Sequence, residues 1–139
     1  MGASTSTLTG VLKGNLHVTP KGLLDREIIK SVYIDSTLVT LAATTQYKLI
    51  HLEADALVMG GYLVTVVAEG AGDTIEVGDA TADHTWLGAT SLNSNDTLTA
   101  FTGNPLYYAA ANEICVYFSA AITVAKFWVI VKMIQLSKV

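Results

Sequence analysis

At 139 residues and a net charge of −4, the chain has the length of one domain that can bury its own core. Hydrophobic residues make up 51% of it and charged residues 14%, against about 25% charged in ordinary soluble domains. The longest apolar runs, residues 56–68 and 120–131, are shorter than the roughly 18 residues that a membrane-spanning helix needs. We therefore expect no membrane partner, and apolar surface that is buried between subunits.

Charge and cysteine content restrict the partners further. Half of the eight Lys and Arg residues lie within the first 30 positions, and none lies between residues 49 and 125, where most acidic residues fall. An acidic region without Lys or Arg repels phosphate backbones, so no nucleic-acid partner is expected. Cys115 is the single cysteine, which excludes an intrachain disulfide and predicts a small buried side chain.

Residues 1–26 differ from the rest of the chain. They are rich in Ser, Thr and Gly and lack a periodic apolar pattern, which predicts an extended N-terminal arm before a β-sandwich domain at residues 27–139. We expect the arm to lie along a neighbouring subunit, for example by adding a strand to an exposed sheet edge. Its expected contact residues are Leu8, Val11, Leu16 and Val18.

From residue 27 onward, short runs of β-branched and aromatic residues alternate with turn signals. This spacing is typical of an all-β, antiparallel, jelly-roll-like sandwich of about eight strands. The expected strands cover residues 27–35, 47–53, 62–69, 74–77, 86–87, 97–101, 106–109 and two runs within 113–136.

The two runs within residues 113–136 have the strongest strand pattern. Small residues at 119–125 separate them, which predicts an antiparallel hairpin. In the second run the face opposite the core is only partly polar, and a strand that is apolar on both faces borders two buried surfaces. We therefore expect Trp128, Ile130 and Ile134 to lie in a subunit or capsid contact. The side chains expected to face the core are Ile114, Val116, Phe118, Phe127, Val129, Val131 and Met133.

An acidic segment at residues 73–84 is the candidate for a ligand or calcium loop. Glu76, Asp79 and Asp83 could supply oxygen ligands, with Trp86 beside them. The spacing does not match a helix–loop–helix calcium loop, and an Asp after a Gly is also what a turn favours. A turn role for Asp79 and a ligand role both stand as hypotheses, and no metal or cofactor is expected.

No catalytic motif is present in the sequence. It contains neither a Gly-x-Ser-x-Gly turn nor a phosphate-binding glycine loop, and its histidines do not have zinc-ligand spacing. A small hydrolase would need His51 or His84 within hydrogen-bond reach of a carboxylate in a cleft. The expectation is that the protein is not an enzyme.

Three features of residues 60–136 carry a resemblance. They are a strand ending Val-Gly-Asp at 77–79, the run Leu-Tyr-Tyr-Ala-Ala-Ala-Asn-Glu-Ile-Cys-Val-Tyr-Phe at 106–118, and a last strand of alternating Val at 125–134. In these features the chain resembles the head decoration, or capsid cement, proteins of tailed bacteriophages. The resemblance implies a homo-oligomer, expected to be a trimer, that is made in the bacterial host cytoplasm and stabilises the capsid surface by bridging major capsid subunits. It brings no catalytic residues.

A carbohydrate- or receptor-binding module of a head or tail fibre is the alternative on the same architecture. Its sign would be an exposed aromatic ring near acidic loops, such as Trp86 beside Asp79 and Asp83.

Overall fold

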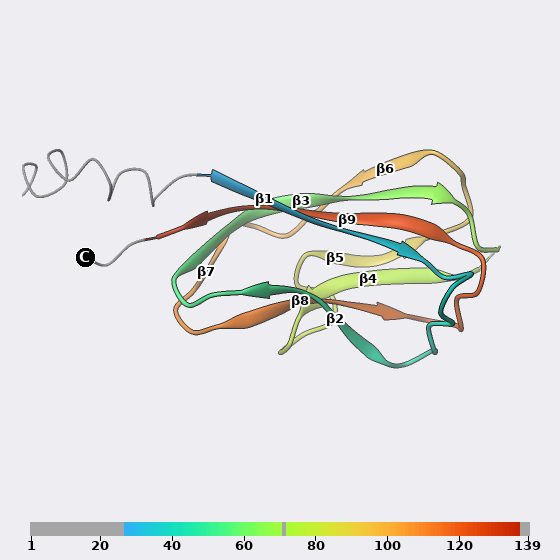
Figure 1. Cartoon of the computed structure of the whole chain (residues 1–139), viewed down its shortest axis with the longest axis horizontal. Helices are drawn as coiled ribbons and strands as arrows, with labels where there is room; N and C mark the ends of the chain where they lie inside the picture. The colour runs from blue at the N-terminus through green and yellow to red at the C-terminus, as the bar shows by residue number, and fades with distance from the viewer. Residues whose placement is uncertain (1–26, 71, 137–139) are drawn as a thin grey trace, which may run out of the picture.

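The computed structural model describes residues 27–70 and 72–136, and within them it contains strands and no helix (Figure 1). No helix long and apolar enough to cross a membrane therefore occurs in this part of the chain. The arm, with its expected contact residues Leu8, Val11, Leu16 and Val18, lies outside the described residues. The strands are β1 (Glu27–Asp35), β2 (Gln46–Leu52), β3 (Ala56–Val67), β4 (Thr74–Asp79), β5 (Leu87–Ser91), β6 (Thr97–Ala100), β7 (Leu106–Tyr108), β8 (Asn112–Phe118) and β9 (Lys126–Gln135).

Two antiparallel sheets stack face to face. The first has the strand order β1-β9-β3-β6, with the short β7 also paired to β3, and the second has the order β2-β8-β4-β5. With β7 set aside, this is the strand order of a jelly roll. The predicted all-β sandwich is confirmed.

The predicted hairpin at residues 113–136 is wrong, because its two strands lie in opposite sheets. β8 pairs with β2 and β4, whereas β9 pairs with β1 and β3. The expected inward faces are nevertheless correct, and they stack against each other across the core, where the Phe118 and Phe127 ring centroids are 5.9 Å apart. Alternation identifies the buried face of a strand, but it does not distinguish a partner beside the strand from one stacked on it. The buried side chains are Ile114, Val116, Phe118, Phe127, Val129, Val131 and Met133.

Glycines explain two further differences from the predicted strands. The Gly60–Gly61 pair, expected to precede a strand, lies inside β3 at a register shift between Val58 and Gly60. A Cβ atom at Gly61 would lie 2.0 Å from the Ile130 carbonyl oxygen, so only glycine lets β3 approach β9 there. Gly78 likewise continues β4 instead of ending it, and it pairs with Cys115.

Candidate assembly surface

The outward side of the first sheet carries a row of exposed apolar side chains. Strand register places one row of side chains across four strands, formed by Tyr33, Trp128, Val64 and Leu98. In the next row on the same side, Ile130 lies beside Tyr62. The Tyr33 and Trp128 rings stack obliquely, with centroids 5.0 Å apart. We call this surface the outer face, formed by Ile29, Tyr33, Tyr62, Val64, Leu98, Trp128, Ile130 and Ile134.

Much of the outer face is open to solvent. Its most exposed side chains are Leu98 (67%), Ile29 (62%) and Tyr33 (43%), and both Tyr62 and Trp128 are 37% exposed. At roughly 150–250 Å² per large side chain, these five residues alone expose on the order of 500 Å². That lies near the upper end of the apolar patches found on monomeric proteins, and such patches commonly mark interaction sites.

The predicted contact residues Trp128, Ile130 and Ile134 all lie on the outer face. Their placement agrees with the alternation of β9, and their role in a subunit contact stays a prediction. Sequence reasoning missed the residues that β1, β3 and β6 add to the same face. The sequence of each of those strands does not by itself indicate a contact surface. Only their pairing in the sheet that contains β9 places their side chains on the same side as Trp128.

The outward side of the second sheet is polar by contrast. His51 Nδ1 lies 2.9 Å from Glu113 Oε1, and His51 Nε2 lies 3.6 Å from Glu53 Oε1. This meets the distance condition set for a hydrolase, but the His51 side chain is 53% exposed on a strand and lacks the shielding from water that a catalytic cleft provides. The two outward sides of the sandwich therefore differ in polarity.

Asp79, one of the predicted ligand residues, is engaged inside the protein. Its carboxylate accepts hydrogen bonds from the backbone N–H groups of Thr81 (2.9 Å) and Ala82 (3.0 Å) and from the hydroxyl of Tyr108 (2.7 Å). Burial raises the Asp79 pKa, but these hydrogen bonds outweigh it and leave the pKa below its ordinary value. The turn hypothesis for Asp79 is therefore confirmed.

The other predicted ligand residues do not converge on Asp79. Asp83 accepts a hydrogen bond from Gln46 at 2.9 Å, and Glu76 lies 3.9 Å from His84 Nδ1. Among residues 27–70 and 72–136, no group of three His, Cys, Asp or Glu side chains could hold a metal ion.

Trp86 is wholly buried, so it is not the exposed aromatic ring beside the acidic loop that the carbohydrate-binding alternative would require. Its indole N–H donates to the Tyr108 hydroxyl at 3.2 Å, and that hydroxyl donates to Asp79. Burial, followed by the Asp79 hydrogen bond, raises the Tyr108 pKa far above its ordinary value. Asp79, Tyr108 and Trp86 form a buried polar triad that joins β4, β7 and the segment before β5, so these residues stabilise the fold and are closed to a sugar.

Cys115 is buried as predicted, with 1% of the residue exposed. Burial, with smaller effects from nearby acidic groups such as Glu113, raises the pKa of its thiol to about 11. The reactive thiolate is therefore scarce at neutral pH.

Glu69, which no sequence pattern identified, connects the end of β3 to the β8–β9 loop. Its carboxylate accepts hydrogen bonds from the backbone N–H groups of Thr123 (3.0 Å), Val124 (2.7 Å) and Ala125 (2.7 Å), and from the Thr123 hydroxyl (3.2 Å). Partial burial raises its pKa, but the backbone hydrogen bonds outweigh burial and hold the pKa below its ordinary value.

We expect a Glu69→Gln variant to lose about 1–2 kcal/mol of unfolding free energy at pH 7, because an amide presents an N–H₂ donor to backbone donors. The wild-type contribution is present above the ordinary glutamate pKa of about 4.3 and is lost as the pH falls through the lower folded-state pKa. Urea unfolding at pH 7 and near pH 3 should therefore show a difference that shrinks in acid. Glu53→Gln, at a side chain that is 70% exposed, is the matched control, and equal losses in both variants would contradict the role of Glu69.

The fold and its surface define a jelly-roll β-sandwich with one apolar and one polar outward side. No protein-family model matches the chain, and no curated protein matches it. Solved phage capsids do contain chains with the same fold. A chain in the acid-stable capsid structure of Helicobacter pylori bacteriophage KHP30 has a TM-score of 0.64 and 15% identity, over 80% of this chain and 89% of that one.

Two further capsid structures extend the similarity. A chain in the capsid of Ralstonia phage GP4 has a TM-score of 0.63 and 12% identity, over 81% of this chain and 86% of that one. A chain in the capsid asymmetric unit of cyanophage Pam1 has a TM-score of 0.58 and 17% identity, over 81% and 84%. At these identities the similarity shows a common fold, and fold alone does not establish function.

Proposed function

We propose that this chain is a bacteriophage virion structural protein that decorates and stabilises the capsid. In this proposal it binds the capsid surface as a homo-oligomer and bridges major capsid subunits. The resemblance in the sequence implies three copies. Its partners are copies of itself and the major capsid protein, with neither nucleic acid nor membrane, and it has no enzymatic role. It is made in the bacterial host cytoplasm.

The observation that carries the proposal is the outer face, on a fold shared with chains of three phage capsids. A sandwich that acted alone in solution would gain little from exposing Trp128, Tyr33 and Leu98 on one side. An assembled protein gains the free energy of burying them, at about 25 cal/mol per Å².

Stabilisation of the shell follows from selective binding. A protein that binds the assembled shell and not the dissociated subunits shifts the assembly equilibrium by mass action. An oligomer strengthens this effect, because after one copy has bound, the others bind at a high effective concentration. A small protein with modest contacts per copy can therefore hold a lattice together.

The test is the native mass of the purified chain, followed by co-sedimentation with shells assembled from the major capsid protein of the same virus. We expect an oligomer that sediments with shells and does not bind dissociated capsid subunits. Shells that carry the protein should also resist heat or denaturant better than bare shells. A monodisperse monomer without affinity for shells would contradict the proposal.

A further inference from the structure

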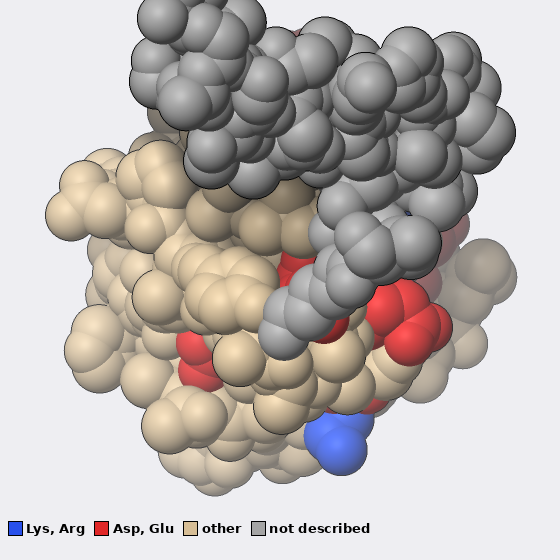
Figure 2. Space-filling view, turned by 90° about the vertical axis from the view of Figure 1, so that its left-hand side faces the viewer, with Lys and Arg blue, Asp and Glu red and all other residues tan. Residues whose placement is uncertain are grey.

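Three exposed aliphatic side chains gather at one end of the sandwich, where β1 ends and β9 begins. Leu38 is 84% exposed and Val39 is 57% exposed, both in the β1–β2 connection, and Val124 in the β8–β9 connection is 47% exposed. We call these three residues the apolar tip. The opposite end, shown in Figure 2, has acidic side chains within a largely uncharged surface.

Hydrogen bonds between the two connections hold the apolar tip in place. The Ser36 backbone N–H (3.0 Å) and hydroxyl (2.7 Å) both donate to the Ala125 carbonyl oxygen. Leu41 and Ile122 exchange backbone hydrogen bonds of 3.0 and 2.8 Å, and both side chains are buried. The Leu38 N–H donates to the Asp35 carbonyl oxygen at 3.1 Å. The exposed side chains thus project from a framework that is fixed before any partner binds.

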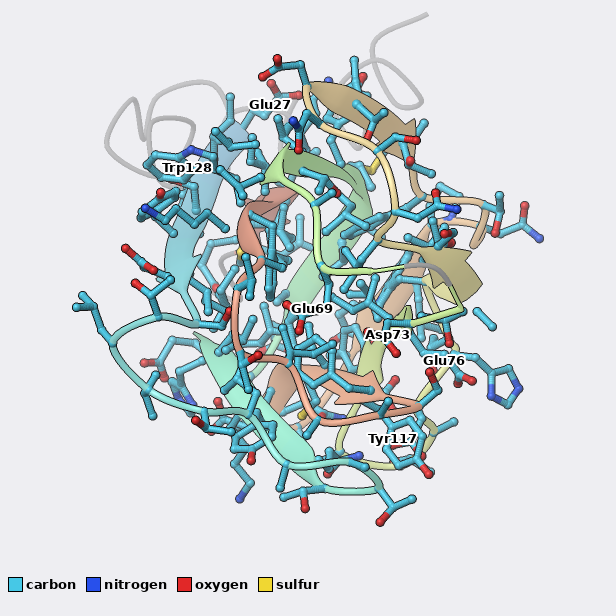
Figure 3. The ribbon with its side chains drawn as sticks, turned by 90° about the vertical axis from the view of Figure 1, so that its right-hand side faces the viewer. Glu27, Glu69, Asp73, Glu76, Tyr117 and Trp128 are labelled. Atoms are coloured by element: carbon cyan, nitrogen blue, oxygen red, sulfur yellow. The ribbon has the colours of Figure 1, made fainter. Side chains whose placement is uncertain are left out.

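Glu69 completes this framework from the connection that follows β3. Its carboxylate holds three consecutive backbone N–H groups of the β8–β9 connection, including that of Val124 (2.7 Å). Figure 3, which looks onto this end, places Glu69 near the centre of the view, between the two sheets. Preorganisation of this kind lowers the ordering cost of binding, so a small contact can contribute useful affinity.

We propose that the apolar tip docks into an apolar pocket on the shell, while the outer face serves contacts between copies. The inference rests on the proposed function. The tip offers on the order of 200 Å² of apolar surface, well below the roughly 800 Å² per partner of a stable protein pair. It is therefore too small to hold two copies together, but suits one of several anchors that an oligomer presents to a lattice.

The tip and the outer face are separate surfaces. Between the Tyr33–Trp128 row and the β1–β2 connection lies the Asp35–Lys126 row, whose side chains form an ion pair of 3.6 Å. A charged pair at the margin gives each apolar surface its own polar rim, as protein interfaces have. One surface can then be altered without the other.

Charge favours a protein partner over a lipid surface. Asp35 and Glu69 lie beside the tip, and Lys126 is paired with Asp35. Loops that insert into membranes generally combine apolar residues with Lys and Arg that attract anionic headgroups. An acidic surrounding lacks that attraction, and it leaves an apolar pocket on a protein as the occupant.

The test uses a Leu38→Ser/Val39→Ser double variant of the full chain, with Leu106→Ser on β7 as a matched control at another partly exposed site. Both variants should keep the wild-type native mass and unfolding midpoint. The double variant should bind assembled shells at least about tenfold more weakly than the wild type in co-sedimentation. The Leu106→Ser control should bind shells with the same affinity as the wild type.

Each result decides a separate question. If wild-type protein binds shells and the double variant binds equally well, the tip inference is overturned and the proposed function stands. If wild-type protein does not bind shells, the proposed function fails and the inference fails with it. A third result is that the wild type binds vesicles, either anionic ones or neutral phosphatidylcholine ones, and that the double variant loses this binding. That result would assign the tip to lipid and overturn the inference that it docks into a protein pocket.

Discussion

An Asp79→Ala variant is expected to lose about 3 kcal/mol or more of unfolding free energy at pH 7. Asp79 is 5% exposed and accepts hydrogen bonds from two backbone N–H groups and the Tyr108 hydroxyl. Hydrogen bonds to a charged acceptor contribute about 1.5–3 kcal/mol each, and donors left buried without a partner add their desolvation cost. Alanine removes the acceptor and leaves all three donors behind.

Asp83→Ala is the matched control four positions along the chain. Asp83 accepts one hydrogen bond, from Gln46 at 2.9 Å, at an exposed site, so its loss should cost less than about 1 kcal/mol. Chemical denaturation of both variants provides the measurement. Equal stability of the two variants would show that the triad does not hold β4 and β7 together.

The Tyr108→Phe variant separates the parts of the triad. It removes the hydroxyl that accepts from Trp86 and donates to Asp79 while keeping the ring. Combined with Asp79→Ala it should be strongly non-additive, because residues that share one hydrogen bond lose it only once. Because the Asp79 pKa is lowered in the folded state, its contribution is present above about pH 4 and is lost as the pH falls through the folded-state pKa.

The sequence predicted the buried faces well and their pairing poorly. Alternation is a local property, so Phe127 and Phe118 could be assigned to the core from their own strands. Whether β8 lies beside β9 or across from it depends on contacts with β1, β2, β3 and β4, which no local pattern encodes. The start of β3 before Gly60–Gly61 was not predicted either, because a bulge inside a strand and a turn before one favour the same residues.

The candidate surface was predicted in part. Apolar residues on both sides of β9 indicated a second buried surface, and they identified Trp128, Ile130 and Ile134. The triad was missed because Tyr108 lies 29 residues from Asp79 and 22 from Trp86. A Trp near three acidic residues is compatible with a ligand site in sequence, and the fold shows that the indole is instead buried and donates to Tyr108.

The second large effect concerns assembly. An Ile130→Lys variant is expected to fold normally and to lose the oligomer, with at least a hundredfold weaker self-association. Ile130 lies in the middle of the outer face beside Tyr62, where a lysine charge would have to be desolvated in a contact between copies. A single chain should tolerate it, because Lys126 and Lys132 already project from the same side of β9.

The neighbouring residues supply the controls for this prediction. Lys132→Gln removes a positive charge on the same side of β9 and introduces none, so it should leave the native mass unchanged. Phe127→Ala acts on the opposite side of the strand, where the ring is wholly buried, and it should cost about 3–5 kcal/mol of stability. Native mass against concentration, together with unfolding midpoints, distinguishes these effects.

Ile130→Lys protein that keeps the wild-type mass would place the contact between copies elsewhere. The outer face would then be free to contact the shell. If instead Ile130→Lys gives a folded monomer that still binds shells weakly, the two surfaces act separately. The remaining affinity should then depend on Leu38 and Val39, because a single copy retains one anchor and loses only the gain from multivalency.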